Sequence, residues 1–277
     1  MSKDANKFPA RLHVLLASDS KVGVVFRRGP SKSVCSVLWN RKTDEFKLGQ
    51  WLRGRIYERR SDISPDGRFL IYFAMNGKWE SETKGSWTAI SKAPWLKAIV
   101  LLGKGDCWHG GGLFTSERKY WLNDGYGHRV IKNNSLVQRD EKYRPKENYG
   151  GECLGVYYIR LQRDGWVMKF SDSKSDDFTI FEKILSHGWI LRKYAHAQVG
   201  APPGKGCYWD EHELEHSESN SRIDGTNWEW ADVDGKKLIW AESGCLFKST
   251  INRKGLGDRK LLFDFNEMKF EAIQAPY

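Results

Sequence analysis

Short runs of hydrophobic, β-branched and aromatic residues recur along the whole chain, and each run ends in turn residues. The runs have the length of strands and lack the spacing of an amphipathic helix. We therefore expect strands over 12–17, 22–27, 34–39, 69–74, 99–102, 156–161, 166–170, 178–184, 189–194, 237–241, 245–250 and 261–265. Only 208–219 is worth testing as a helix.

Turn dipeptides separate these runs and are spread over the whole chain. Asp-Gly or Asn-Gly pairs, at which a hairpin can reverse, begin at residues 66, 76, 124, 164, 224 and 234. The 277 residues include 13 Trp, 13 Phe, 11 Tyr and 27 Gly but only four Met, a mixture that suits strands and tight turns. The pattern predicts an all-β chain folded as a single domain over residues 1–277.

One of these turns carries a motif. The segment 64–73 reads Ser-Pro-Asp-Gly-Arg-Phe-Leu-Ile-Tyr-Phe, and 232–241 repeats its Asp-Gly turn, basic residue and apolar run. The first segment resembles the turn between inner strands in a blade of Tol-type and WD-repeat β-propellers, although the Gly-His start and Trp-Asp end of a true WD repeat are missing. The resemblance implies four-stranded antiparallel blades around a central axis.

The length of the chain limits the number of such blades. At about 40 to 55 residues a blade, it allows roughly five to seven, and the irregular spacing of the turns favours five. A pair of β-sandwiches would also produce short strands with turns, and it stays open as the alternative fold. Separately, the segment 55–62 resembles bacterial proteins of unknown function, which implies a bacterial source but no activity.

Positive charge is concentrated in the first half of the chain. The formal net charge is +10 overall. Residues 1–150 contain 28 basic and 15 acidic residues, a balance of +13, whereas residues 151–277 contain 17 and 20, a balance of −3. An anionic partner should therefore meet the first half.

The densest basic cluster lies at 51–60. If 51–59 is one strand, alternation places five side chains on one face, where guanidinium groups and aromatic rings could hold phosphate or carboxylate: Trp51, Arg53, Arg55, Tyr57 and Arg59. A solvated outer strand, or arginines that bridge blades through backbone carbonyls, would give the same pattern. We predict a partner-binding face here.

The Gly-rich segment 103–112 predicts a tight loop between strands. It contains Trp108 and His109, which we include among the candidate partner-binding residues because the loop could line a ligand pocket. The order of glycines is not that of a P-loop. His109 to Gly112 spells the oxyanion loop of esterases, but no Gly-x-Ser-x-Gly nucleophile turn accompanies it.

The segment His212-Glu213-Leu214-Glu215-His216 matches the spelling of a zinc-protease motif. On a helix, His212 and His216 could bind one zinc ion while Glu213 activates its water. On a strand, the two histidines share one face and Glu213 lies on the other, which separates the base from the metal. We expect the strand, with no metal and no cofactor.

Other features favour a soluble cytoplasmic protein. No apolar stretch has the length of a signal peptide or membrane span, and five cysteines without a Cys-x-x-Cys pair suggest reduced thiols. The sequence predicts a non-catalytic binding or scaffold propeller that engages a protein or anionic partner through one end of its axis. A hydrolase using carboxylate and His groups, in its sharpest form zinc-dependent, and a weak nucleic-acid binder stay open as alternatives.

Overall fold

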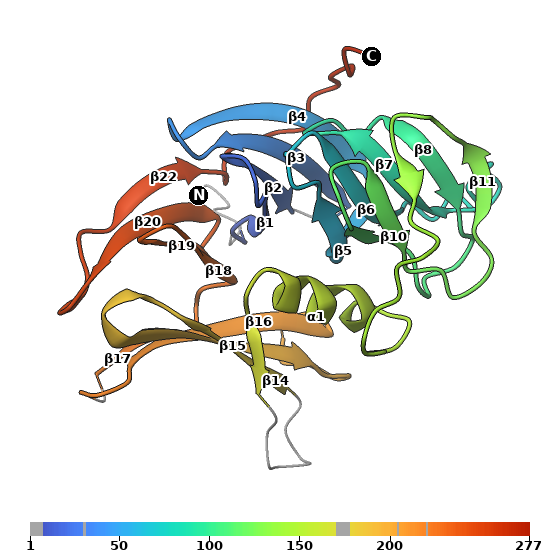
Figure 1. Ribbon diagram of the computed structural model, residues 1–277. Coiled ribbons are helices and arrows are strands. Elements are labelled where there is room, and N and C mark those ends of the chain that lie inside the picture. Colours follow the sequence, from blue (N-terminus) through green and yellow to red (C-terminus); the bar gives the residue numbers. More distant parts are fainter. Residues whose placement is uncertain (1–7, 30–31, 170–177, 204, 220) are drawn as a thin grey trace. The chain divides into compact units, whose positions relative to one another are not determined.

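The computed structural model describes residues 8–29, 32–169, 178–203, 205–219 and 221–277 (Figure 1). Half of the described residues lie in strands and 5% lie in helices, which confirms the predicted all-β class. Within the described residues, no helix is both long and apolar enough to cross a membrane. The chain divides into two compact units. The first unit comprises Val14–Leu161 and Lys269–Tyr277, and the second comprises the chain up to His13 and Gln162–Met268.

The first unit contains two large sheets whose strands follow mainly the order of the sequence. One sheet has the order β1-β2-β3-β4, and the other has the order β11-β8-β7-β6-β5. Their strands are β1 (Arg11–Leu16, which crosses the boundary between the units), β2 (Val22–Arg28), β3 (Ser33–Asn40), β4 (Glu45–Arg53), β5 (Arg55–Ile63), β6 (Phe69–Met75), β7 (Ser86–Lys92), β8 (Ala98–Gly103) and β11 (Arg129–Lys132).

A small third sheet of the first unit positions the candidate site. It has the order β12-β10-β9 and consists of β9 (Gly112–Phe114), β10 (Lys119–Leu122) and β12 (Gln138–Arg139). The β10 strand pairs antiparallel with β9 and parallel with β12. A hydrophobic cluster that includes Ile71, Ile90, Phe114 and Leu122 joins this sheet to the sheet of β5–β8, so β9 and β10 are held from one side by a packed core.

The predicted motif at 64–68 forms the turn between β5 and β6. The Ser64 hydroxyl donates to the Asp66 carboxylate at 2.6 Å and accepts the Phe69 N–H at 2.9 Å. Gly67 has φ +79°, and a Cβ there would lie 2.7 Å from Val22 Cβ, so both conformation and space require glycine. Ser64, Asp66 and Gly67 therefore each have a structural role in this turn.

The second unit also contains two meander sheets. One has the order β13-β14-β15-β16-β17, and the other has the order β18-β19-β20-β21, with β22 paired to β20. The strands are β13 (Val167–Lys169), β14 (Phe178–Ile184), β15 (Trp189–Ala197), β16 (Tyr208–His216), β17 (Arg222–Gly225), β18 (Trp230–Asp234), β19 (Lys237–Glu242), β20 (Cys245–Asn252), β21 (Gly255–Leu256) and β22 (Lys260–Asp264). A 3-10 turn, η1 (Ser186–Gly188), precedes β15.

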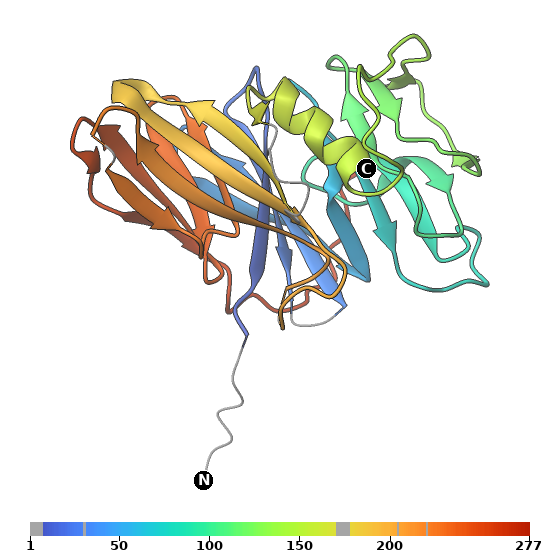
Figure 2. The ribbon, with the colours of Figure 1, turned by 90° about the horizontal axis from the view of Figure 1, so that it is seen from below.

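One sequence prediction of secondary structure is wrong. The run 156–161, predicted as a strand, lies in the helix α1 (Leu154–Arg163), which runs beside β5 (Figure 2). The segment 208–219, which was worth testing as a helix, contains the strand β16, as expected for its residues His212 to His216. The other predicted strands are confirmed, and their ends differ from the predicted ends by three residues at most. Phe170, the predicted end of one strand, lies outside the described residues.

Residues 51–59 do not form one strand, so the condition for a shared face of five side chains is not met. β4 ends at Arg53 and β5 begins at Arg55, and the two strands belong to different sheets. The chain changes sheet at Gly54, whose N–H donates to the Lys32 carbonyl at 2.8 Å. A Cβ at Gly54 would lie 2.7 Å from the Met75 carbonyl oxygen, so the crossing requires glycine. The alternation assumed for 51–59 is interrupted at this point.

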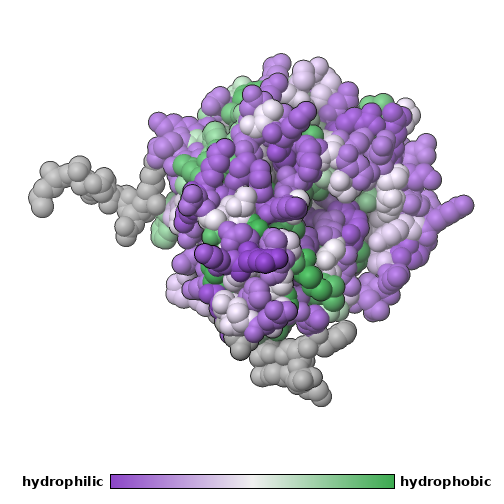
Figure 3. Space-filling view, turned by 60° about the vertical axis from the view of Figure 1, so that its left-hand side comes forward, coloured by the Kyte–Doolittle hydropathy of each residue, from purple (hydrophilic) through white to green (hydrophobic). Residues whose placement is uncertain are grey.

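The surface drawn in Figure 3 is mainly hydrophilic, with small separate hydrophobic areas. The large exposed hydrophobic side chains are likewise scattered along the sequence, and they include Trp79, Trp108 and Tyr126. Scattered apolar residues are ordinary on a protein surface. Recognition on this face is therefore to be sought among polar and charged groups.

Candidate functional site

Arg53 and Arg55 form an exposed pair, here called the arginine edge, where β4 passes into β5. The Arg53 guanidinium lies 4.6 Å from the centre of the Phe270 ring, and that of Arg55 lies 4.5 Å from the centre of the Tyr57 ring. Neither guanidinium forms an ion pair with any residue that the structure describes. An aromatic face restricts a guanidinium without using its hydrogen-bond donors, so both groups are free to bind an anion.

The other residues of the predicted face are not exposed in the same way. Trp51 and Tyr57 are half-buried, and Arg59 is buried with its guanidinium 4.6 Å from the Tyr157 ring centre. The pairing of β5 with β6 is irregular between Tyr57 and Asp62. This irregularity turns Arg59 inward, so a single face holding all five side chains does not exist.

The Gly-rich segment forms the predicted loop, between β8 and β9. His109, Gly110 and Gly111 have φ of 56°, 84° and 71° in succession. A Cβ at Gly110 would lie 2.3 Å from the Phe73 ring, and one at Gly111 would lie 1.9 Å from the Arg60 carbonyl oxygen. Close packing therefore explains the glycines.

Buried Arg60 holds this loop in place through hydrogen bonds to its backbone. Its guanidinium donates to the carbonyls of Cys107, at 2.7 Å, and His109. The Arg60 side chain belongs to β5, and its Cζ lies 5.0 Å from the ring centres of both Tyr57 and Phe73. The arginine thus joins the loop to the strand by hydrogen bonds.

The backbone N–H groups of residues 109–111 in the loop already donate hydrogen bonds inside the protein. The N–H of His109 donates to Gly151 O, that of Gly110 donates to Asn123 O at 2.8 Å, and that of Gly111 donates to the Thr88 hydroxyl at 2.9 Å. An oxyanion hole or phosphate cradle needs free donors. Residues 109–111 therefore hold neighbouring segments together, and their amides form neither an oxyanion hole nor a phosphate cradle.

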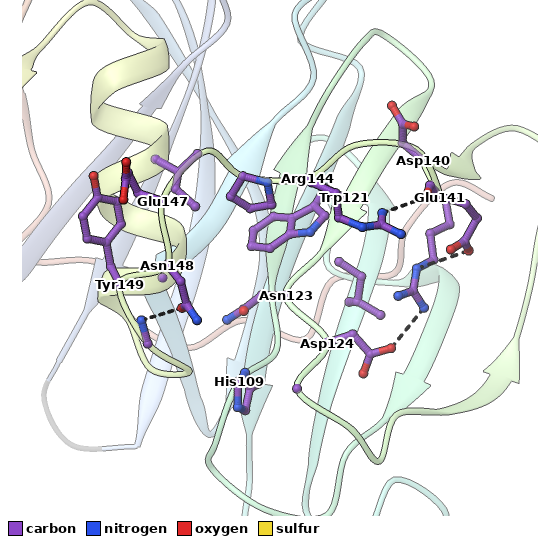
Figure 4. A pocket seen from close by; sticks show the side chains of 17 residues that line it. His109, Trp121, Asn123, Asp124, Asp140, Glu141, Arg144, Glu147, Asn148 and Tyr149 are labelled. Carbon is purple, nitrogen blue, oxygen red and sulfur yellow. Dashed lines mark hydrogen bonds and ion pairs between the residues drawn. The ribbon is translucent and has the colours of Figure 1, made fainter.

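His109 lines a pocket of about 400 Å³ in the first unit (Figure 4), whereas Trp108 is 57% exposed and does not line it. The His109 ring is held between Gly125 and Gly151, where a Cβ would lie 2.0 Å and 2.3 Å from the ring. The pocket walls come from β10, the loop that follows it, the segment 139–150 and α1: Trp121, Leu122, Asn123, Asp124, Gly125, Arg139, Asp140, Glu141, Arg144, Pro145, Glu147, Asn148, Tyr149, Gly150, Gly155 and Ile159.

A hydroxyl–imidazole–carboxylate chain lies beside the pocket and has the order of a catalytic triad. Asp124 Oδ1 is 2.9 Å from His128 Nδ1, and His128 Nε2 is 3.0 Å from Thr88 Oγ1. Thr88 is fully buried, does not line the pocket, and accepts the Gly111 N–H. A nucleophile must reach its substrate, so this chain supports the loop rather than a reaction.

The surroundings of Asp124 and His128 shift their proton affinities in the same direction. Burial acts to raise the pKa of the Asp124 carboxyl, but hydrogen bonds and charge from His128 and Arg139 outweigh burial and lower it. Burial lowers the pKa of His128 and outweighs the opposing effect of Asp124. The ionised carboxylate and the neutral imidazole are therefore the forms that folding favours.

The zinc-like segment lies in β16, as the strand interpretation predicted. His212 is buried, with Nδ1 2.6 Å from the Trp228 carbonyl oxygen and Nε2 2.7 Å from the Lys193 ammonium. Glu213 lies on the other face, where Tyr194 donates to it at 3.2 Å. Both His212 nitrogens thus have partners within the second unit.

His216 is engaged with its own turn. Its Nδ1 accepts the backbone N–H groups of Glu218 and Ser219 at 3.3 and 3.2 Å, and its ring lies edge-on to Trp189. Among the described residues, no group of three His, Cys, Asp or Glu side chains is arranged to hold a metal ion. Both histidines of the motif therefore have structural contacts within a strand and the turn that follows it.

Tertiary structure thus combines some predicted residues and separates others. It joins Arg53 with Arg55 and places His109 in a pocket with residues that the sequence reasoning missed, chiefly Trp121, Asn123 and Asp124. An Asp and a His four residues apart, with Gly125 and Gly127 between them, form a sequence signal for the contact between Asp124 and His128. For Asn123 nothing in the sequence suggested a role.

No family model matches the chain, and no curated protein matches it. Among solved structures, hydrazine synthase of Kuenenia stuttgartiensis is similar with a TM-score of 0.34 and 10% identity, over 94% of this chain and 88% of that chain. An uncharacterized protein of Listeria monocytogenes EGD-e, lmo1340, has a TM-score of 0.27 and 9% identity, over 92% of this chain and 66% of that chain. The tricorn protease has a TM-score of 0.26 and 11% identity, over 92% of this chain and 26% of that chain. These similarities assign neither a family nor an activity.

Proposed function

We propose that this protein is a non-catalytic binding module, that its meander sheets are the blades of a β-propeller, and that its arginine edge binds an acidic segment of a protein partner. Strands in sequence order in the sheets of β1–β4 and β5–β8, and the turn at 64–68, support the blade interpretation. The binding role rests on one observation: Arg53 and Arg55 are exposed and unpaired among the described residues, and each lies on an aromatic ring.

An acidic protein segment suits this edge better than a nucleic acid. A guanidinium binds a carboxylate through two parallel hydrogen bonds, and two arginines separated by one residue match a short row of carboxylates. Nucleic-acid binding requires a broader basic surface, but the nearby Arg28 is already paired with Glu58 at 3.1 Å. The hydrolase alternative has less support, because the amides of 109–111 and the nitrogens of His212 are engaged within the protein.

The test reverses the charge of the arginine edge. We expect the double variant Arg53→Glu/Arg55→Glu to bind a fluorescein-labelled oligoglutamate peptide roughly tenfold more weakly, or worse, than the wild type at low salt. Binding by the wild type should weaken as salt is added, because exposed charges are screened. Fluorescence anisotropy measures both effects. The melting temperature should hardly change, since both side chains are exposed.

The control is Arg253→Glu/Lys254→Glu, which makes the same change of charge on an exposed turn of the second unit. It should retain wild-type affinity for the peptide. Equal weakening in both double variants would show that net charge alone attracts the peptide, and the proposal would be wrong. Tighter binding of a single-stranded oligonucleotide than of the peptide, lost in Arg53→Glu/Arg55→Glu, would favour the nucleic-acid alternative.

A further inference from the structure

The pocket at His109 shares no lining residue with the arginine edge and offers a different chemistry. Its volume of about 400 Å³ lies in the range of small-molecule sites. Figure 4 shows Asn148 and Tyr149 on one side, Trp121 and Asp124 on the other, and Asn123 and His109 between them. The question is which class of ligand these groups would recognise.

Asn123 is the polar group that points to a ligand. The residue is 6% exposed, yet its side-chain oxygen accepts no hydrogen bond from any described residue. Its Nδ2 makes one long hydrogen bond, 3.4 Å, to the Gly110 carbonyl. Its backbone is fixed on both sides, because its carbonyl accepts the Gly110 N–H at 2.8 Å and its own N–H donates to Gly111 O at 3.0 Å. A rigid amide thus presents an unused acceptor to the pocket.

Further unused hydrogen-bonding groups surround this amide. Asn148 Oδ1 accepts the Gly150 N–H at 2.9 Å, which fixes the side chain and leaves its Nδ2 to donate. The Trp121 indole N–H donates to no described residue, and Glu147 has no described partner. The pocket therefore presents donors and acceptors in similar measure, next to the flat indole ring.

The charged side chains that line the pocket are two arginines and four carboxylates, a formal excess of two negative charges. Arg139 is paired with Asp124 at 3.0 Å and with Glu141 at 3.3 Å. The Asp140 carboxylate accepts the Thr115 hydroxyl at 2.7 Å and two backbone N–H groups. Glu147 and Arg144 form no ion pair with a described residue. The negative excess disfavours an anionic ligand, and carboxylate oxygens can accept hydrogen bonds from the hydroxyls of a neutral one.

We infer that this pocket binds a neutral polyhydroxylated ligand, of the chemical class of a sugar. A hydroxyl both donates and accepts, so it can satisfy Asn123 and Asn148 together. The apolar C–H face of a sugar ring can pack on the Trp121 indole, as apolar groups do on aromatic faces. Neither contact requires a charge on the ligand.

The experiment titrates the chain of residues 1–277 with four neutral disaccharides, namely cellobiose, maltose, lactose and N,N′-diacetylchitobiose, and measures binding by calorimetry and saturation-transfer NMR. We expect at least one to bind saturably, with a Kd of roughly millimolar or tighter. Asn148→Ala, on an exposed loop, should weaken that binding about fivefold or more, and Trp121→Ala should abolish it. Trp108→Ala, which removes an exposed indole outside the pocket, should leave the affinity unchanged.

Several results would overturn the inference. These are no saturable binding of any of the four sugars by the folded wild type, or binding that Asn148→Ala and Trp108→Ala affect equally. Tighter binding of glucuronate or glucosamine than of glucose would overturn the neutral class. Arg53→Glu/Arg55→Glu should bind the sugar normally, so failure at this pocket is distinguishable from failure of the proposed partner site.

Discussion

At the scale of single residues, His128 connects the pocket to the core. Its two ring nitrogens lie within hydrogen-bond distance of Asp124 and of buried Thr88, and Thr88 accepts the N–H of Gly111. Because burial lowers the pKa of His128 below its ordinary value of 6.5, the unfolded chain takes up this proton before the folded chain does. Protonation therefore favours unfolding.

This linkage predicts a pH-dependent stability. His128 should cost the wild type stability as the pH falls from about 6.5 towards the lower pKa of the folded state. Asp124, whose pKa is also lowered, adds a second loss only below its ordinary value of 3.8. The melting temperature of His128→Gln should therefore fall less between pH 7 and pH 5 than that of the wild type, as measured by scanning calorimetry.

The matched control is His187→Gln, because His187 is exposed. This variant should show the same fall in melting temperature as the wild type. If His128→Gln instead kept the full wild-type pH dependence, the imidazole would not be the buried neutral group that the structure indicates.

At the scale of elements, α1 shows how a buried charge can conceal a helix. The buried positions Cys153, Val156, Tyr157, Arg160 and Leu161 have helical spacing, but an arginine stands in the apolar stripe. The β-branched and aromatic residues of 156–161 are typical of a strand, which explains the wrong prediction. Arg160 is buried because its guanidinium donates to the carbonyls of Ser61 and, at 3.3 Å, Glu58.

Loss of this guanidinium should destabilise the first unit. Arg160→Met keeps much of the side-chain volume but leaves buried carbonyls without their donor, so we expect a loss of about 2–3 kcal/mol in the free energy of unfolding. Urea denaturation followed by fluorescence measures it. Arg163→Met, one turn later and exposed, should change the stability by less than about 0.5 kcal/mol. Similar small losses in both variants would contradict the bridging role of Arg160.

At the scale of the whole molecule, each unit is completed by a chain segment distant in sequence. The segment Lys269–Tyr277 belongs to the first unit. Tyr277 donates to the Lys97 carbonyl at 2.6 Å and accepts the Lys92 N–H at 3.1 Å, and its ring packs against the core cluster of that unit. The prediction of a single domain over residues 1–277 stays a prediction.

The last residue should therefore matter to stability. Tyr277→Ala removes two hydrogen bonds and a packed ring, and we expect it to cost about 2 kcal/mol, which should lower the melting temperature by several degrees. Gln274→Ala, an exposed position in the same segment, should have almost no effect on melting. A melting temperature for Tyr277→Ala equal to that of the control would show that the segment does not contribute to the fold.

The sequence by itself determined most strands, the turn at 64–68 and the strand character of His212 to His216, because alternation and turn preferences act between residues close in the chain. Only the tertiary structure decided that Arg59 is buried while Arg53 and Arg55 are exposed. It also brought Asn123, Asn148 and Trp121 to one pocket with His109. These arrangements depend on packing between segments distant in sequence, for which a local pattern of hydrophobic and polar residues contains no information.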